Sequence, residues 1–202
     1  MKKGLMLLSA GIDSPVAGHI MGKKAEIEAL HLKSCEKHLE MVERLCIKAG
    51  IKKLHYTDHT KVLEQIKSKA REDYTCVLCK RAMIMIAEKA ALMNGCEFIV
   101  TGDNLGQVAS QTLDNMAVIS SAAKMPVLRP LLCNDKNEII KIAEKIGTFG
   151  ISSEKCPSCQ FVPRHPATAA RIKEIEAEEE KIGMRKIADD AVREIKVKII
   201  SG

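Results

Sequence analysis

The feature that most constrains the fold is an alternation of short, wholly apolar runs with longer amphipathic stretches. Residues 4–8 and 98–101 are apolar runs bounded by polar loops, as expected of strands buried on both faces of a parallel sheet. Residues 36–49, 80–93 and 135–146 repeat apolar side chains at helical spacing. Strands that alternate with helices predict βαβ units, and therefore a doubly wound, mostly parallel α/β sheet flanked by helices.

The rest of the chain fits the same arrangement. Further strands and helices are predicted at residues 26–32, 53–56, 60–70, 105–123, 168–181 and 194–200. Residues 151–166 hold three prolines and two cysteines and predict a structured loop. We expect one domain over residues 1–166, with residues 167–202 as a helix and strand extension of that domain. The acidic run at residues 178–180 is expected on a solvated helix face.

Composition narrows the class of protein. No stretch approaches the roughly 18 apolar residues of a membrane span, and no signal-peptide pattern is visible, so we expect a cytoplasmic protein without a membrane partner. The formal net charge of +6 is compatible with a polyanionic partner such as RNA and equally with a merely basic protein. Because there are only two Tyr, three Phe and no Trp, stacking platforms for single-stranded nucleic acid are not indicated.

Eight cysteines in an intracellular chain favour metal binding or thiol chemistry over disulfides. Cys76 and Cys79 form one C-x-x-C pair, and Cys156 and Cys159 form a second. Spacing alone is compatible with a four-thiolate zinc site and with a redox dithiol. The single cysteines, which we predict to be core residues, are Cys35, Cys46, Cys96 and Cys133.

The loop directly after the first predicted strand has the parts of a phosphate site. Its small residues allow backbone N–H groups to surround phosphate oxygens, and Ser14-Pro15 predicts an N-cap and the start of a helix. Ser9 and Ser14 supply hydroxyl donors, and Asp13 is expected to hold Mg²⁺ or to shape the loop. A plain strand–turn–helix connection is the alternative, and neither a Walker nor a Rossmann motif is present.

Residues 7–17, Leu-Leu-Ser-Ala-Gly-Ile-Asp-Ser-Pro-Val-Ala, resemble the S-G-G-x-D-S motif of the PP-loop (N-type ATP pyrophosphatase) class. They are most similar to the version in the tRNA 4-thiouridine synthetase family, the ThiI-type sulfurtransferases. Further matching segments follow in the family's order at residues 77–83, 100–112, 126–131, 135–136 and 164–166. The resemblance covers most of residues 2–170 and implies an ATP-using PP-loop fold.

The resemblance also implies which residues bind ATP. Those expected to line the adenine and ribose are Leu7, Leu8, His31 and Leu32. Those expected around the phosphates are Ser9, Ala10, Gly11, Ile12, Asp13 and Ser14. Lys80, Gly102 and Gln111 are expected to complete the site, with Lys80 and Asp13 in catalytic roles. Ala10 departs from the family's usual Gly and adds a methyl group to the loop.

Two polar residues outside that set have open roles. Asp103 follows a predicted strand end, where it could hold Mg²⁺, contact a uridine or form a turn. Arg129 could bind phosphate or RNA, and a structural ion pair is an equally good interpretation.

For the cysteines the resemblance implies the archaeal, iron–sulfur type of the family. Cys76, Cys79 and Cys159 match the three ligands of a [4Fe–4S] cluster whose remaining iron is open to sulfide, with zinc as the fallback metal. In bacterial members the position of Cys159 carries a catalytic persulfide instead. Cys156 is additional, and a fourth ligand, a resolving thiol and a bystander are all compatible with its position.

The implied reaction adenylates a uracil carbonyl of tRNA with ATP and then replaces the oxygen with sulfur, giving 4-thiouridine. Because the match does not include the family's ferredoxin-like and THUMP domains, we expect a member that lacks THUMP and that reaches tRNA alone or through a separate RNA-binding partner. The alternatives are a small-molecule acceptor, desulfuration, or a non-catalytic subunit that carries a cluster or nucleotide. A homodimer is compatible with the sequence.

Overall fold

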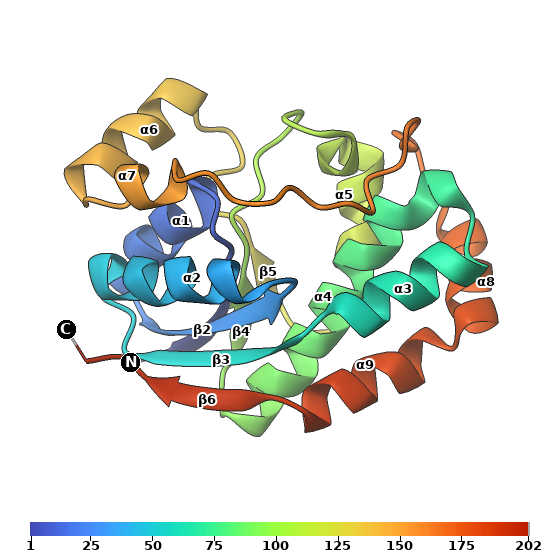
Figure 1. Ribbon diagram of the computed structural model, residues 1–202, viewed down its shortest axis with the longest axis horizontal. Helices are drawn as coiled ribbons and strands as arrows, with labels where there is room; N and C mark the ends of the chain where they lie inside the picture. Colours follow the sequence, from blue (N-terminus) through green and yellow to red (C-terminus); the bar gives the residue numbers. More distant parts are fainter. Residues whose placement is uncertain (202) are drawn as a thin grey trace.

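The computed structural model describes residues 1–201, and over that range the chain forms a six-stranded sheet in the order β5-β4-β1-β2-β3-β6 (Figure 1). The strands are β1 (Lys3–Leu7), β2 (Glu26–Lys33), β3 (Lys53–Asp58), β4 (Phe98–Val100), β5 (Val127–Leu128) and β6 (Lys196–Ile199). Strands β1 to β5 pair in parallel, and β6 pairs antiparallel with β3 at one edge. The predicted mostly parallel α/β sheet is therefore confirmed.

The strand order reverses beside β1. The chain runs from β1 outward through β2 to β3, and then returns to place β4 on the other side of β1. In open α/β sheets such a switch point opens a crevice at the carboxyl ends of the two strands, and ligands bind there. The loops that follow β1 and β4 meet at this crevice, so it is the part of the fold in which to look for a site.

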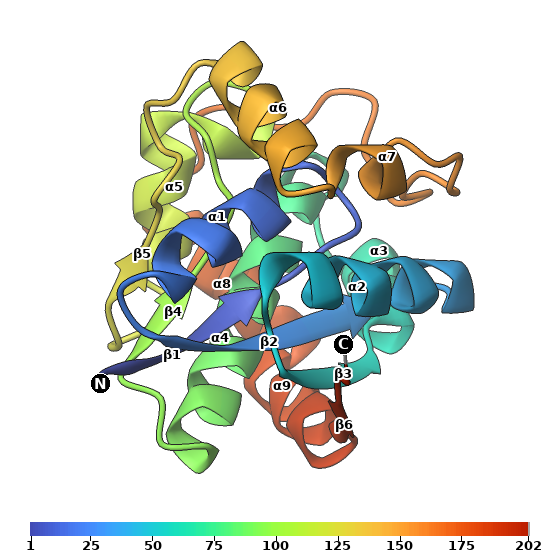
Figure 2. The ribbon, with the colours of Figure 1, turned by 90° about the vertical axis from the view of Figure 1, so that its left-hand side faces the viewer.

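Helices cover both faces of the sheet. Figures 1 and 2 show one face under α1 (Asp13–Gly22) and α2 (Glu36–Ala49), with α6 (Lys136–Lys145) packed on α1, and the opposite face against α4 (Thr75–Met93) and α9 (Met184–Arg193). The remaining helices are α3 (Thr60–Lys69), α5 (Leu113–Ser120), α7 (Phe149–Ser152) and α8 (Ile172–Ile182), with 3₁₀ turns η1 (Glu72–Tyr74) and η2 (Ala109–Gln111).

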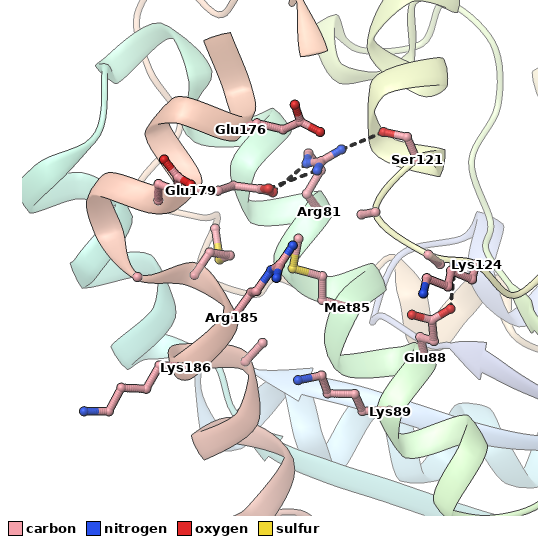
Figure 3. Close-up of a pocket in the computed structure, with 16 residues that line it drawn as sticks. Arg81, Met85, Glu88, Lys89, Ser121, Lys124, Glu176, Glu179, Arg185 and Lys186 are labelled. Atoms are coloured by element: carbon pink, nitrogen blue, oxygen red, sulfur yellow. Dashed lines mark hydrogen bonds and ion pairs between the residues drawn. The ribbon is translucent and has the colours of Figure 1, made fainter. Parts of the chain in front are cut away.

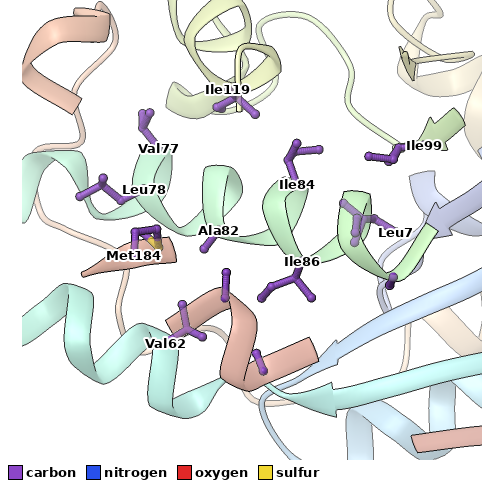
Figure 4. Packing of buried hydrophobic residues seen from close by; sticks show 14 of the residues in the cluster. Leu7, Val62, Val77, Leu78, Ala82, Ile84, Ile86, Ile99, Ile119 and Met184 are labelled. Atoms are coloured by element: carbon purple, nitrogen blue, oxygen red, sulfur yellow. The ribbon is translucent and has the colours of Figure 1, made fainter. Parts of the chain in front are cut away.

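Alternate residues of β1 enter different cores, as the two-residue period of a strand requires. Leu5 packs in the cluster around α4, whereas Met6 packs in the cluster under α1, α2 and α6. Figure 4 shows the first cluster, in which residues of α4 such as Ile84 and Ile86 meet Val62 of α3 and Ile119 of α5. Because both faces of the sheet are covered, residues 4–7 of β1 can all be apolar and buried.

Several predicted boundaries were wrong. Helix α4 begins at Thr75 rather than at residue 80, because the turn η1 precedes it and Thr75 Oγ1 donates to the Glu72 carbonyl. The stretch 105–123 is divided into η2 and α5 at Thr112, whose hydroxyl accepts from the Asn115 backbone N–H. Helix α9 was not predicted. In the structure Gly183 adopts the left-handed conformation (φ 71°), which ends α8, and the same residue is the N-cap of α9.

The C-terminal segment is joined to the rest by an ion pair as well as by apolar packing. Arg81 Nε on α4 lies 2.6 Å from Glu179 Oε1 on α8, and the two side chains are only 4% and 12% exposed. The expectation that the acidic run lies on a solvated face was therefore wrong at Glu179, since its carboxylate compensates a buried guanidinium. No helix within residues 1–201 has the length and apolarity needed to cross a membrane.

Candidate active site

The loop between β1 and α1 is closed by two serine hydroxyls. The Ser9 backbone N–H donates to Ser14 Oγ at 2.9 Å, and the two hydroxyl oxygens lie 3.0 Å apart. Helix α1 begins at Asp13 with Ile12 at the N-cap position, so the predicted N-cap role of Ser14 was wrong. Its hydroxyl fastens the loop across to Ser9 instead. The turn is thereby held at the positive end of α1, where anions bind favourably.

A cavity of about 230 Å³ opens at the switch point between β1 and β4. The predicted nucleotide residues that line it are Leu7, Ser9, Gly11, Asp13, Ser14, Lys80, Gly102 and Gln111. Thr101, Asp103, Met83, Ile84 and Ile119 complete the lining. The structure therefore brings most of the predicted set into one place, from β1, α1, α4 and the loop after β4.

Five predicted nucleotide residues do not line this cavity: Leu8, Ala10, Ile12, His31 and Leu32. Ala10 packs against Met41, Leu45 and Ile151, so its extra methyl group contacts an apolar cluster rather than the cavity. Leu8 and His31 are linked to each other behind the loop. Their contact with a nucleotide stays a prediction.

Gly102 allows the two loops to meet. A Cβ built at Gly102 would lie 2.7 Å from both the Cα and the backbone N of Ser14, closer than real Cβ contacts. The neighbours are main-chain atoms of α1, which cannot swing away as a side chain would. A glycine is therefore required where the loop after β4 passes the phosphate loop.

Asp103 is the electrostatic centre of the cavity wall. Its carboxylate lies 2.6 Å from Lys80 Nζ and 3.4 Å from Arg129 Nε, and it accepts hydrogen bonds from Thr101 Oγ1 at 2.9 Å and Gln111 Nε2 at 3.2 Å. Burial raises the pKa of Asp103, but Lys80 and these donors outweigh burial and lower the pKa to about 2. Asp103 is thus an ionised anchor for two cations, and Arg129 forms the structural ion pair that was one of its two predicted roles.

Asp13, at the first position of α1, also lines the cavity. Its Oδ1 lies 2.6 Å from Nζ of Lys136, the first residue of α6. Sequence reasoning assigned Asp13 to Mg²⁺ or to loop shape and included Lys136 in a matching segment, but gave Lys136 no role in the site. A carboxylate beside a cavity for phosphates is a suitable Mg²⁺ ligand, and Lys136 neutralises it in the metal-free protein.

His31 is a buried, neutral imidazole behind the phosphate loop. Its Nδ1–H donates to the Leu8 carbonyl at 2.9 Å, which leaves Nε2 buried without a partner among the described residues. Burial lowers the pKa of His31 to about 4, with a smaller opposing effect from the Leu8 carbonyl. An acceptor nitrogen with no partner is suited to a donor on a ligand, such as a ribose hydroxyl.

We expect His31 to make the fold acid-sensitive between pH 6.5 and pH 4. Its folded pKa is lowered, so below pH 6.5 the unfolded chain binds a proton that the folded chain does not, and stability falls with pH until about pH 4. Relative to a His31→Asn variant, the wild type should lose about 1.4 kcal/mol of unfolding free energy per pH unit in that window. Urea unfolding at pH 7.5, 6 and 5 measures this, and identical slopes would contradict it.

The three predicted cluster cysteines lie near enough to one another and to Lys80 for their charges to act on the Cys79 thiol. Cys76 and Cys79 lie in the first turns of α4, and Cys159 lies in the loop between α7 and α8. Burial raises the pKa of the Cys79 thiol to about 12, and the charges of Cys159 and Cys76 raise it further, while Lys80 opposes them. His59 Nε2 lies 3.4 Å from Cys79 Sγ, a neighbour that sequence reasoning missed.

Other cysteines depart from the expected pattern. Cys46 and Cys96 are buried as predicted, but Cys133 is exposed and Cys35 is half-buried. Within residues 1–201, the only three potential metal-ligating groups whose ligand atoms all lie within 4.8 Å of one another belong to Cys35, His38 and Cys156. The sulfur atoms of the four C-x-x-C cysteines are thus not assembled as one zinc site.

A larger cavity of about 820 Å³ lies on the other side of α4, where α8 and α9 face it (Figure 3). Its charged lining includes Arg81, Glu88, Lys89, Glu176 and Arg185, so charges of both signs line it. Arg81 is already compensated by Glu179, and Glu88 accepts from the backbone N–H groups of Lys124 and Met125. None of the predicted nucleotide residues lines this cavity.

Comparison with known proteins shows the family of the chain. Residues 1–184 match the family model described as "Thiamine biosynthesis protein (ThiI)". A probable tRNA sulfurtransferase of Methanocaldococcus jannaschii is 45% identical over 189 residues, which cover 89% of this chain and 50% of that protein. A probable tRNA sulfurtransferase of Alkaliphilus oremlandii is 37% identical over 210 residues, which cover 98% of this chain and 54% of that protein.

Among solved structures, a 4-thiouridine synthetase in complex with RNA and bound ATP superposes with a TM-score of 0.94 at 36% identity, covering 99% of this chain and 55% of that one. The chain thus spans about half the length of the relatives that it matches. The match to the family model includes every predicted site residue and all six segments of the sequence resemblance. This chain belongs to the ThiI family.

Proposed function

We propose that the chain is an ATP-dependent sulfurtransferase that acts on a uridine of tRNA in the cytoplasm. The observation that carries the proposal is the position of Lys80, which lines the phosphate-type cavity and lies next to Cys79 in the same helix. One residue thus connects a nucleotide site with a group of three thiols. Proteins of this family that match the chain are named tRNA sulfurtransferases, and the matching solved structure contains RNA and ATP.

In the first half-reaction, the uracil carbonyl oxygen attacks the α-phosphorus of ATP and pyrophosphate leaves. Backbone N–H groups of the phosphate loop and the Lys80 ammonium stabilise the charge that develops on the phosphates. Lys80 can turn from Asp103 toward this charge without leaving the cavity wall, since both residues line it. Asp13 is the residue best placed to hold Mg²⁺ with the phosphates.

In the second half-reaction, sulfide attacks the activated carbon, and AMP leaves with the original oxygen. If a persulfide on Cys159 attacks instead, its outer sulfur bonds to the carbon, and an added thiol must then cleave the S–S bond, which releases 4-thiouridine and leaves a disulfide on Cys159 for a second thiol to reduce. Cys159 is exposed, so its sulfur is accessible to an acceptor above the cavity. Cys76, Cys79 and Cys159 are the residues that would hold a [4Fe–4S] cluster, because each cluster thiolate binds a different iron and the three thiols lie near enough for Cys76 and Cys159 to act electrostatically on Cys79. Such a cluster would supply an open iron that binds sulfide.

The same proposal treats residues 1–166 as the PP-loop domain and residues 167–202 as part of it. Its support is that β6 extends the sheet beside β3 and that Glu179 pairs with Arg81 of α4.

The test is anaerobic purification followed by iron, sulfide and zinc analysis, together with assays for AMP formation and for 4-thiouridine in an unmodified tRNA transcript. With sulfide and ATP present, the wild type should form both products. Cys159→Ser should form AMP but at least 100-fold less 4-thiouridine, and Lys80→Met should lose both. Cys133→Ser, at an exposed thiol, is the matched control and should be unaffected.

Two results would refute parts of the proposal. Stoichiometric zinc without iron would rule out the cluster. If ATP were turned over with a small uracil compound but not with tRNA, the sulfur acceptor would be a free small molecule rather than tRNA.

A further inference from the structure

We propose that Cys35, His38 and Cys156 form a second metal site, for Zn²⁺, that fastens the loop carrying Cys159 to helix α2. The potential ligand atoms of these three residues all lie within 4.8 Å of one another, and each residue is partly buried. Two thiolates and an imidazole are the ligand types that favour zinc over Mg²⁺ or Ca²⁺. The residues are distinct from the thiols of Cys76, Cys79 and Cys159, so the site does not depend on the proposed function.

The spacing of the ligands is close to what a zinc ion needs. With Zn–S bonds of about 2.3 Å and Zn–N bonds of about 2.0–2.1 Å, tetrahedral ligands lie about 3.5–3.8 Å apart. Side-chain movements of about 1 Å or less would therefore close the three groups around an ion, and water would occupy the fourth position.

The start of α2 presents two of the ligands. Cys35 is the N-cap residue of α2, and its side chain makes no capping hydrogen bond, so the thiol is available. The spacing Cys35-Glu36-Lys37-His38 places His38 in the first turn, above Cys35. Ser34 Oγ lies 2.9 Å from His38 Nδ1 and fixes the ring, in the manner of the outer partners of metal-bound histidines, which leaves Nε2 for the ion.

The third ligand is held in place by contacts that involve no metal. Glu154 Oε1 lies 2.7 Å from Arg44 Nη2 of α2, and Lys37 Nζ donates to the Lys155 carbonyl. Cys156 itself packs against an apolar cluster of Met41, Leu45 and Ile151, which shields one side of the group. The segment before Cys156 is thus held against α2, and the Cys156 thiol lies beside Cys35. Pre-positioning of this kind lowers the ordering cost of binding an ion.

The site is connected to both parts of the candidate active site. Cys159 follows Cys156 by three residues, so an ion at Cys156 limits how far Cys159 can move from α2. Ala10 of the phosphate loop packs on the same apolar cluster as Cys156, and Ser152 Oγ donates to the Gly11 carbonyl at 3.3 Å. Zinc binding would therefore fix the loop that carries Cys156 and Cys159 relative to the phosphate loop.

The test uses a Cys76→Ser/Cys79→Ser/Cys159→Ser parent, in which the proposed cluster ligands are absent. The parent is purified anaerobically with reductant, stripped with a chelator and titrated with Zn²⁺ and with Co²⁺ as a spectroscopic probe. We expect one equivalent of metal and a thiolate-to-Co²⁺ charge-transfer band. Adding Cys156→Ser or His38→Asn to the parent should weaken Zn²⁺ binding by at least about 100-fold, and adding Cys133→Ser should not.

Thermal unfolding distinguishes loss of the site from loss of the fold. Without metal, the parent and its Cys156→Ser derivative should unfold at similar temperatures, and Zn²⁺ should raise the Tm of the parent alone. No metal binding in the parent, or binding that survives Cys156→Ser, would overturn the proposal. So would a reduced parent that binds no Zn²⁺ but forms a Cys35–Cys156 disulfide in air, as detected by mass spectrometry.

Discussion

A Gly102→Ala variant is expected to lose ATP binding by at least about 100-fold while remaining folded. The new methyl group would lie 2.7 Å from Ser14 Cα and N, so the loop after β4 and the start of α1 must separate. Overpacking of this kind costs about 1–3 kcal/mol of stability, less than the margin of a typical domain. Displacing α1 moves the backbone N–H groups that are proposed to bind phosphate, and misplaced donors no longer match the anion.

Isothermal titration with a non-hydrolysable ATP analogue measures the affinity, and urea unfolding measures the stability. Gly22→Ala is the matched control. Gly22 lies in α1, the helix that the Gly102→Ala substitution would displace, and a Cβ at Gly22 meets no atom within 4 Å. That control should bind the analogue as the wild type does and unfold within about 1 kcal/mol of it. Nucleotide affinity in Gly102→Ala within twofold of wild type would show that the cavity is not the ATP site.

Gly102 also shows how far sequence reasoning reaches. Its importance could be predicted from the family pattern, and its place after a buried strand from the apolar run before it. The reason that it must be glycine could not be predicted, because it depends on β4 returning beside β1 and bringing Gly102 against Ser14. Local patterns fix the elements, whereas the strand order that makes this contact depends on the packing of the whole sheet.

The errors have similar causes. Helix α4 was started too late because the C-x-x-C pair was placed at the entry to the helix rather than within it, whereas the apolar residues Val77 and Leu78 pack in the core as part of the helix. Cys35 was assigned to the core because a single cysteine carries no spacing signal. Its neighbour Cys156 is distant in sequence, so only the fold reveals the pair. Long-range pairs such as Arg81 with Glu179 were missed for the same reason.

The charge of Asp103 should contribute about 2 kcal/mol to stability at neutral pH. Burial raises its pKa, but Lys80 and the hydrogen bonds from Thr101 and Gln111 outweigh burial and lower the pKa from the ordinary 3.8 to about 2, and each pKa unit corresponds to about 1.4 kcal/mol. Because the folded pKa is the lower one, this stabilisation is present above pH 4 and is lost as pH falls toward 2. Asp103→Asn should therefore be less stable than wild type by about 2 kcal/mol at pH 7 and by about 1 kcal/mol near pH 3.

Urea unfolding at both pH values tests this, with Glu64→Gln at an exposed position of α3 as a control that changes stability at pH 7 by less than about 0.5 kcal/mol. A double-mutant cycle with Lys80→Met then assigns the effect to the pair, since a coupling energy isolates the interaction of two residues from their separate losses. A coupling of about 1 kcal/mol or more is expected from the 2.6 Å contact of two partly buried groups. Coupling near zero would mean that Asp103 acts through Arg129 and its hydrogen bonds, and that Lys80 is free to serve the phosphates without first giving up a partner.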